Sequence, residues 1–113
     1  MEAESLDPNI EPPYYAVIFA SVRSMAEPLE YEQMAGRMIE LARHQPGFLG
    51  VVSARETLGI TVSYWSNLKS IRNWKRQIEH AQAQAKGRSG WYKRYSVKVA
   101  KVVRAYDFEA AGI

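Results

Sequence analysis

The chain has 113 residues, of which 47% are hydrophobic and 24% charged, and it contains no cysteine. Its length fits one compact domain, and its hydrophobic fraction is too high for an intrinsically disordered chain. No apolar run reaches the roughly 20 residues that span a bilayer, no signal-peptide pattern opens the chain, and a disulfide or a thiolate metal site is excluded. We therefore expect a cytoplasmic protein that does not associate with membranes.

Charge is unevenly distributed along the chain. Lysine and arginine number 15 against 12 aspartate and glutamate, which gives a net charge of +3. Acidic residues dominate up to Glu32, and basic residues dominate from Lys69 to Arg104. A basic half raises the question of nucleic acid, but no nucleic-acid-binding motif accompanies the charge. A solvated basic surface is the preferred interpretation, and nucleic acid is not an expected partner.

The first third of the chain predicts a tail, a strand and a helix. Residues 1–13 are acidic and contain three prolines, which predicts a disordered or extended tail. The run Tyr14–Val22 is β-branched and aromatic without alternation, which predicts a strand covered on both faces. Pro28 predicts the start of a helix. Its apolar residues recur at near-helical spacing until Pro46–Gly47 ends the pattern.

Two further strands and a second helix follow. Residues 48–56 and 60–65 predict strands, and the short connection between them predicts an antiparallel hairpin. Ser66 or Asn67 fits the N-cap of the second helix. An apolar stripe at spacings of three and four extends that helix until Gly87 terminates it.

The remaining segments complete a known order of elements. Residues 87–94 predict a loop, residues 95–106 a long last strand, and residues 109–113 a frayed C-terminus. The order β-α-β-β-α-β predicts the ferredoxin-like α+β arrangement, with a four-stranded antiparallel sheet and both helices on one face, in a single domain over residues 14–108. Because the first two strands are apolar on both faces and two helices cover only one, the other face needs an apolar partner. We expect a homodimer whose sheets pack face to face as an α+β barrel.

Most enzyme motifs are absent from the sequence. No glycine-rich phosphate loop follows a strand, no nucleophile elbow is present, and His44 and His80 are too far apart for a two-histidine zinc motif. We therefore expect no metal and no cofactor. The remaining chemistry is aromatic and cationic, and a cleft ringed by indole and phenol donors suits a flat, partly oxygenated ligand. The residues for such a cleft, between the sheet and the helices, are Trp65, Trp74, Trp91, Tyr92 and Tyr95.

Each of these groups also has a purely structural interpretation. Trp74 lies on the apolar stripe of the second helix, which favours a core residue, whereas for Trp65 both interpretations stay open. Trp91 fits a packing lid over the helix end equally well. On a straight helix His80 falls about 200° from Ile78, which favours an exposed side chain. If the helix breaks just before it, His80 faces the cleft and can serve as a base near neutral pH.

Several of these segments together resemble the antibiotic biosynthesis monooxygenase (ABM) superfamily. The resemblance covers residues 14–108 and implies a dimeric α+β barrel. Known members oxidise polyketide anthrones and quinols without metal or flavin, and others degrade haem. The residues that carry the resemblance are Pro46-Gly47-Phe48, Thr61–Trp65, Leu68, Ile71, Trp74, Glu79-His80, Ala83-Gln84, Gly87-Arg88, Trp91-Tyr92, Tyr95 and Val99–Tyr106.

Individual site residues of the superfamily are matched only in part. The anthrone-oxidising members share a tryptophan at the position of Trp65, but they have asparagine and tyrosine where this sequence has Thr61 and Ile71. The haem-degrading members share the tryptophan at Trp74, but they have an iron-ligating histidine where this sequence has Gln84.

The resemblance implies a cofactor-independent monooxygenase that oxidises an aromatic quinol- or anthrone-like small molecule with O2. The alternative is a non-catalytic dimeric barrel that binds a small aromatic or haem-like ligand. The candidate catalytic residues are His80 and Trp65, and the candidate substrate-binding residues are Tyr64, Trp74, Arg88, Trp91 and Tyr92.

Overall fold

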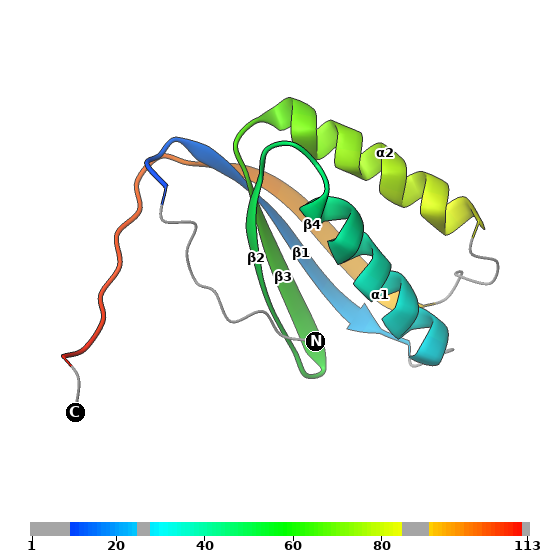
Figure 1. Ribbon diagram of the computed structural model, residues 1–113. Helices are drawn as coiled ribbons and strands as arrows, with labels where there is room; N and C mark the ends of the chain where they lie inside the picture. The colour runs from blue at the N-terminus through cyan, green and yellow to red at the C-terminus, as the bar shows by residue number, and fades with distance from the viewer. Residues whose placement is uncertain (1–9, 25–27, 85–90, 112–113) are drawn as a thin grey trace.

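The computed structural model describes residues 10–24, 28–84 and 91–111, with backbone alone for residues 80–84. The described chain contains four strands and two helices in the order that the sequence predicts (Figure 1). The elements are β1 (Tyr14–Arg23), α1 (Pro28–Arg43), β2 (Phe48–Arg55), β3 (Leu58–Trp65), α2 (Leu68–Gln84) and β4 (Tyr92–Val102).

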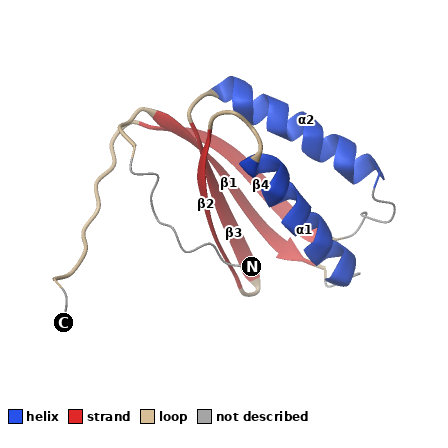
Figure 2. Cartoon of the chain, viewed as in Figure 1, coloured by secondary structure: helices blue, strands red, loops and turns tan. Residues whose placement is uncertain are grey.

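The four strands form one antiparallel sheet in the order β2-β3-β1-β4. Both helices lie over the same face of this sheet (Figures 1 and 2). This is the ferredoxin-like α+β fold, and the sequence-based prediction of fold class is confirmed. No helix among the described residues is long and apolar enough to cross a membrane.

The strand register separates the two faces of the sheet. Val17 packs with Ala42 of α1 and Ile71 of α2, so alternate residues of β1 from Tyr15 onwards define the helix face. The residues between them, with their partners on β3 and β2, define the open face. On these three strands, β1, β2 and β3, the open face is almost entirely apolar. Its residues are Ala16, Ile18, Ala20, Val22, Val52, Ala54, Leu58, Ile60, Val62 and Tyr64.

Two hydrophobic clusters hold the helices on the sheet. The first contains Val17, Ala42, Trp65 and Ile71, with Tyr15, Phe48 and Trp74 packed against it. The second contains Met34 and Trp91, with Tyr31, Met38, Leu41 and Tyr92 packed against it. The chain reaches the first cluster through Gly47, whose φ of 91° suits glycine. A side chain at Gly47 would collide with the hydroxyls of Ser66 and Ser70 at the start of α2.

The ends of several elements differ from the prediction. The hairpin turn is tighter, because β3 begins at Leu58 and β2 ends at Arg55. β4 begins at Tyr92 rather than at residue 95 and ends at Val102 rather than at residue 106. Its length is set by its partner, since Tyr14 pairs with Val102 at one end of β1 and Arg23 pairs with Tyr92 at the other. The chain beyond Val102 is strand-like in composition but pairs with no strand of the described chain.

Helix α2 begins at the predicted cap and continues without a break. The side-chain oxygen of Asn67 accepts a hydrogen bond from the backbone N–H of Ser70 at 2.8 Å, which is the N-cap contact. The helix then continues unbroken to Gln84. The break that would turn His80 towards the cleft is therefore absent from the backbone, and the predicted terminator Gly87 lies outside the described residues.

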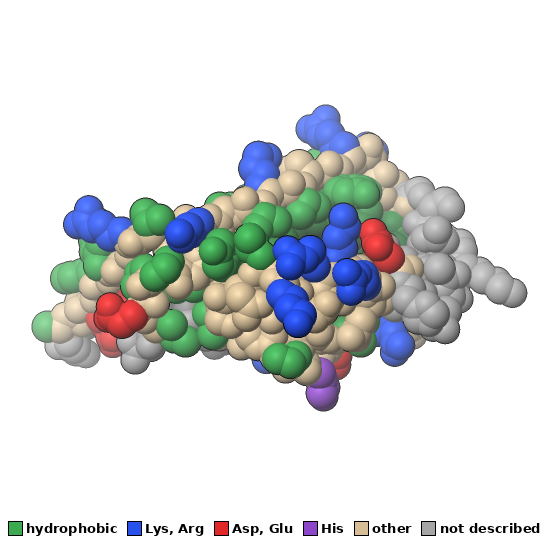
Figure 3. Space-filling view, turned by 90° about the horizontal axis from the view of Figure 1, so that it is seen from above, with side chains coloured by type: hydrophobic (Ala, Val, Ile, Leu, Met, Phe, Trp, Pro, Cys, Tyr) green, Lys and Arg blue, Asp and Glu red, His purple; other side chains and the backbone are tan. Residues whose placement is uncertain are grey.

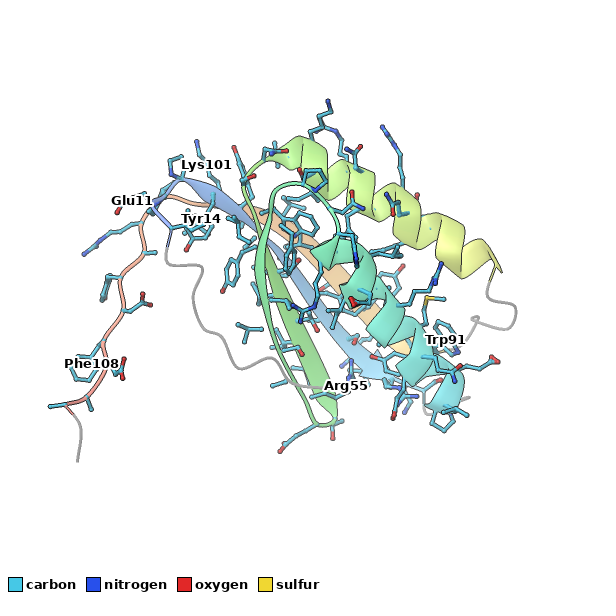
Figure 4. All side chains as sticks on the ribbon, in the orientation of Figure 1. Glu11, Tyr14, Arg55, Trp91, Lys101 and Phe108 are labelled. Carbon is cyan, nitrogen blue, oxygen red and sulfur yellow. The ribbon has the colours of Figure 1, made fainter. Side chains whose placement is uncertain are left out.

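Residues 103–111 form an arm that extends away from the sheet (Figure 1). The arm has no helix or strand, and its large apolar side chains are exposed: Val103 by 74%, Tyr106 by 80% and Phe108 by 88%. Phe108 lies far from the body of the domain (Figure 4).

Candidate functional site

The helix face of β4 is left uncovered by the two helices. Tyr95, Val97 and Val99 pair with Ser21, Phe19 and Val17 of the helix face, yet about half or more of each of these three side chains is exposed. We call Phe19, Tyr92, Tyr95, Val97 and Val99 the β4 strip. Its three rings contact one another, with centroids 5.5 to 5.6 Å apart. Seen from above, hydrophobic side chains form a band across the molecule with Lys and Arg beside it (Figure 3).

Trp65 lies in the core beneath the helices rather than at an open surface. It is completely buried, and its indole N–H donates to the hydroxyl of Ser63 at 2.9 Å. Its ring lies 5.0 Å from that of Trp74, whose own indole N–H donates to the carbonyl of Met38 at 3.0 Å. The two tryptophans lie side by side, but their indole donors are already used within the chain.

Trp91 and Tyr92 lie at the end of the sheet where α1 begins. Trp91 is only 3% exposed and packs on Met34 of α1. Its indole nitrogen is buried and has no hydrogen-bond partner in the part of the chain that the structure describes. Tyr92 is half-buried, contacts the ring of Tyr31 and continues into the β4 strip through Phe19.

Three of the predicted site residues do not join this group. Tyr64 lies on the open face, where its ring contacts that of Tyr14 at 5.9 Å, so it points away from Trp65. Burial and the neighbouring phenol of Tyr14 raise the pKa of Tyr64. The side chain of His80 and the whole of Arg88 lie outside the described residues.

A cationic cluster that the sequence did not reveal lies beside Tyr92. The guanidinium carbon of Arg23 lies 3.8 Å above the ring of Tyr31, and that of Arg55 lies 5.8 Å from the same ring centroid. Arg55 also donates a hydrogen bond to the buried hydroxyl of Ser21. Arg55 and Trp91 lie at the end of the sheet opposite Tyr14 and Lys101 (Figure 4).

A glycine allows Arg55 to reach this cluster. Gly59 of β3 pairs with Arg55 on one side and with Ser21 on the other, so the Arg55 side chain crosses β3 to reach β1. A Cβ at Gly59 would collide with the guanidinium group of Arg55. Glycine inside a strand often marks such a close approach, so Gly59 is the feature of the sequence that indicates this contact.

Tyr92 is a neutral hydrogen-bond donor over the physiological pH range. Burial raises its pKa well above the usual value of 10.0, and the hydrogen bond with Tyr31 adds to this, whereas Arg55 and Arg23 oppose it. Its phenol therefore holds its proton where a free tyrosine would begin to lose it.

The raised pKa of Tyr92 predicts a loss of stability in alkali. Above pH 10 the unfolded chain loses the Tyr92 proton while the folded chain keeps it, so the free energy of unfolding falls as pH rises through and beyond this value. The Tyr92→Phe variant, which cannot ionise, should lose less stability between pH 9 and pH 11 than the wild type in urea titrations. An equal loss in both proteins would contradict the assigned shift.

No group of three or more His, Asp or Glu residues able to hold a metal ion occurs among the described residues. His44, the described histidine, lies just after α1, and its Nδ1 lies 2.8 Å from the carbonyl oxygen of Glu40. This position near the helix C-terminus gives His44 a structural role.

Known structures share this fold at low sequence identity. SnoaB, a cofactor-independent oxygenase from Streptomyces nogalater, superposes with a TM-score of 0.61 and 16% identity, over 80% of this chain and 95% of its own. A predicted antibiotic biosynthesis monooxygenase from Caulobacter crescentus gives a TM-score of 0.66 and 12% identity, over 81% and 92%. A variant of MhuD with two manganese protoporphyrin IX molecules bound per active site gives 0.62 and 21%, over 83% and 99%. The chain therefore shares its fold with these oxygenase and monooxygenase structures, as the resemblance implies.

One curated relative is much more similar in sequence. The uncharacterised protein YqjZ of Bacillus subtilis is 54% identical over 101 residues, which is 88% of each chain. The chain therefore belongs to the same protein family as YqjZ, within the ABM fold. No protein-family model matches the sequence.

Proposed function

We propose that the protein is a cofactor-independent monooxygenase that oxidises an aromatic quinol- or anthrone-like small molecule with O2. The observation that carries the proposal is the β4 strip, an exposed apolar surface with phenol groups on the helix face. Such a surface suits a flat, partly oxygenated ring system. The fold shared with SnoaB, a cofactor-independent oxygenase, supports the proposal.

The reaction balances without any other redox partner. An anthrone methylene loses a proton to a base, and the resulting enolate transfers electrons to O2. One oxygen atom enters the product as a new carbonyl, and the other leaves as water with the two methylene hydrogens. The substrate supplies all four electrons, so the protein has only to bind it, accept a proton and stabilise the developing negative charge on oxygen.

The predicted site residues take different parts in this proposal. His80 is the base, which requires its side chain to reach the substrate from the unbroken helix α2, and Trp65 with Trp74 forms the buried layer beneath the site. Tyr92 binds one end of the substrate with the buried Trp91 packed behind it, and Arg88 is retained as a binding residue. Tyr64 lies on the open face, so we assign it to the contact between protomers.

The two histidines provide a matched test. The His80→Ala variant is expected to lose at least tenfold in the rate of O2 consumption with an anthrone, because general base catalysis contributes about 100-fold or more. The His44→Ala variant, at the end of α1, should keep the wild-type rate. Trp65→Phe keeps an aromatic ring but loses the hydrogen bond to Ser63, and it is expected to slow the reaction severalfold. Losses of no more than twofold in both His80→Ala and Trp65→Phe would contradict the assignment.

A second candidate function is a non-catalytic barrel that binds a small aromatic or haem-like ligand. It is favoured by the positions that differ from the anthrone-oxidising pattern, since Ile71 is a buried core residue and can offer a substrate no hydrogen bond. Purified protein would then carry a chromophore, or bind one with a difference spectrum, and would consume no O2 with it.

We also propose that the protein is a homodimer joined through the open face. Ile60 and Leu58 are 42% and 52% exposed on an apolar sheet surface. Surfaces of this kind mark contacts between chains. The arm over residues 103–111 adds exposed apolar side chains that a second protomer would cover.

A further inference from the structure

The cationic cluster at the end of the β4 strip has unsatisfied hydrogen-bonding capacity. Nε and Nη2 of Arg23 are buried and have no hydrogen-bond partner among the described residues. Neither Arg23 nor Arg55 forms an ion pair with a carboxylate of the described residues. Partial desolvation of a guanidinium group raises its free energy when no counter-ion lies beside it. An anion that binds next to it would offset this desolvation free energy.

The cluster is assembled from four elements and is held in place. Arg55 comes from β2, Arg23 and Ser21 from β1, Tyr31 from α1 and Tyr92 from β4. Ser21 is almost completely buried and fixes one nitrogen of Arg55, while Tyr31 stacks beneath Arg23. These contacts hold both guanidinium groups in place although Arg55 is an exposed residue. The absence of a Cβ at Gly59 leaves the space that the Arg55 guanidinium group occupies.

The strand register connects this cluster to the β4 strip. Arg55, Gly59, Ser21 and Tyr95 form one row across the sheet, so the guanidinium at Ser21 lies one strand away from Tyr95. Neighbouring strands are about 4.8 Å apart. From Tyr95 the strip continues through Val97 to Val99, about 13 Å of strand at the usual rise per residue. An anionic group on the cluster and a flat apolar body along the strip can thus belong to one ligand.

We propose that Arg23 and Arg55 bind the carboxylate of an aromatic carboxylic acid whose ring system lies along the β4 strip. Guanidinium groups present paired N–H donors that match a carboxylate. The Tyr92 phenol beside them is hydrogen-bonded to Tyr31 and stays neutral, so it brings no negative charge that would repel the carboxylate. This inference rests on the proposed function and specifies its substrate class: the oxidised molecule carries a carboxylate at one end.

A pair of ligands that differ only in charge tests the inference. Isothermal titration with 2-naphthoate and 2-naphthamide compares an anionic and a neutral head group on the same rings. The wild type should bind 2-naphthoate at least tenfold more tightly than 2-naphthamide. Arg55→Met and Arg23→Met should each remove most of this difference and leave the affinity for 2-naphthamide within about twofold.

Two further variants distinguish the effect of the cationic cluster on binding from the effect of the protein's net charge. Arg72→Met removes the same charge from the exposed side of α2 and should leave the preference for 2-naphthoate unchanged. Gly59→Ala keeps both arginines but displaces Arg55, and should lower the preference as Arg55→Met does. The inference is overturned if 2-naphthoate does not bind at millimolar concentration, if both ligands bind equally, or if Arg72→Met has the same effect as Arg55→Met.

Failure of the proposed carboxylate subsite and failure of the proposed oxygenase activity give different results. Selective binding of 2-naphthoate with no O2 consumption on any quinol or anthrone supports the carboxylate subsite and counts against the oxygenase. Oxidation of an uncharged anthrone at a rate unchanged in Arg23→Met and Arg55→Met, and not raised by adding a carboxylate to the substrate, supports the oxygenase and overturns the subsite.

Discussion

Ile60→Asp is expected to convert the proposed homodimer into a monomer. Ile60 is 42% exposed on the open face and pairs with Ala20 and Ala54, so the substitution leaves the fold of a single protomer intact. In a symmetric dimer it would bury two unpaired carboxylates in the contact between the sheets. At about 3 kcal/mol or more for each of the two buried charges, the dimer Kd should rise by about ten-thousandfold or more. Light scattering at micromolar concentration measures the change.

A matched substitution on the other side of the molecule provides the control. Leu29 of α1 is 69% exposed over the helix layer, and Leu29→Asp should leave the dimer unaffected. A wild-type protein that is monomeric at micromolar concentration, or an Ile60→Asp variant that stays dimeric, would contradict the proposed contact. Deletion of the arm after Val102 measures its separate contribution to the same Kd.

Trp65→Ala is expected to cost about 3 to 5 kcal/mol of the free energy of unfolding, as large-to-small core substitutions of this kind do. Trp65 is completely buried, and its ring contacts those of Phe48 and Trp74 in the cluster that joins both helices to the sheet. The substitution also leaves the hydroxyl of Ser63 without its donor. Urea unfolding followed by circular dichroism measures the loss.

The size of this loss separates two roles for Trp65. Leu29→Ala, at an exposed position, should change the free energy of unfolding by no more than about 0.5 kcal/mol. A loss below about 1 kcal/mol in Trp65→Ala would contradict the core role. Such a result would mean that the indole occupies a site which tolerates an empty volume, as a ligand pocket does.

The order of elements was predictable because each one carries a local signal. The β-branched and aromatic run of β1 and the cap at Asn67 act through neighbouring residues, and both structures form where expected. The ends of β4 were not predictable in this way, because they depend on pairing with Tyr14 and Arg23, which lie far away in the sequence. The sequence after Val102 resembles a strand, but a strand needs a partner.

The candidate site was predictable in part, for the same reason. Trp65 and Trp74 come together because both lie on apolar stripes that face the core. Tyr64 was grouped with Trp65 by proximity in sequence, yet adjacent strand residues point to opposite faces. The contact between Arg55 and Ser21 spans 34 residues and passes over Gly59, so it depends on a register that composition and periodicity do not reveal.

The measurement that tests the central claim most directly is the fate of ¹⁸O₂ with protein freed of metal and flavin. An anthrone is supplied with the labelled gas, and oxidation without protein is subtracted at each pH. Mass spectrometry should find one labelled oxygen in each new carbonyl, formed in proportion to protein concentration and unaffected by chelator. Product formation that does not depend on the protein, or that stops when a chelator is present, would contradict a cofactor-independent monooxygenase.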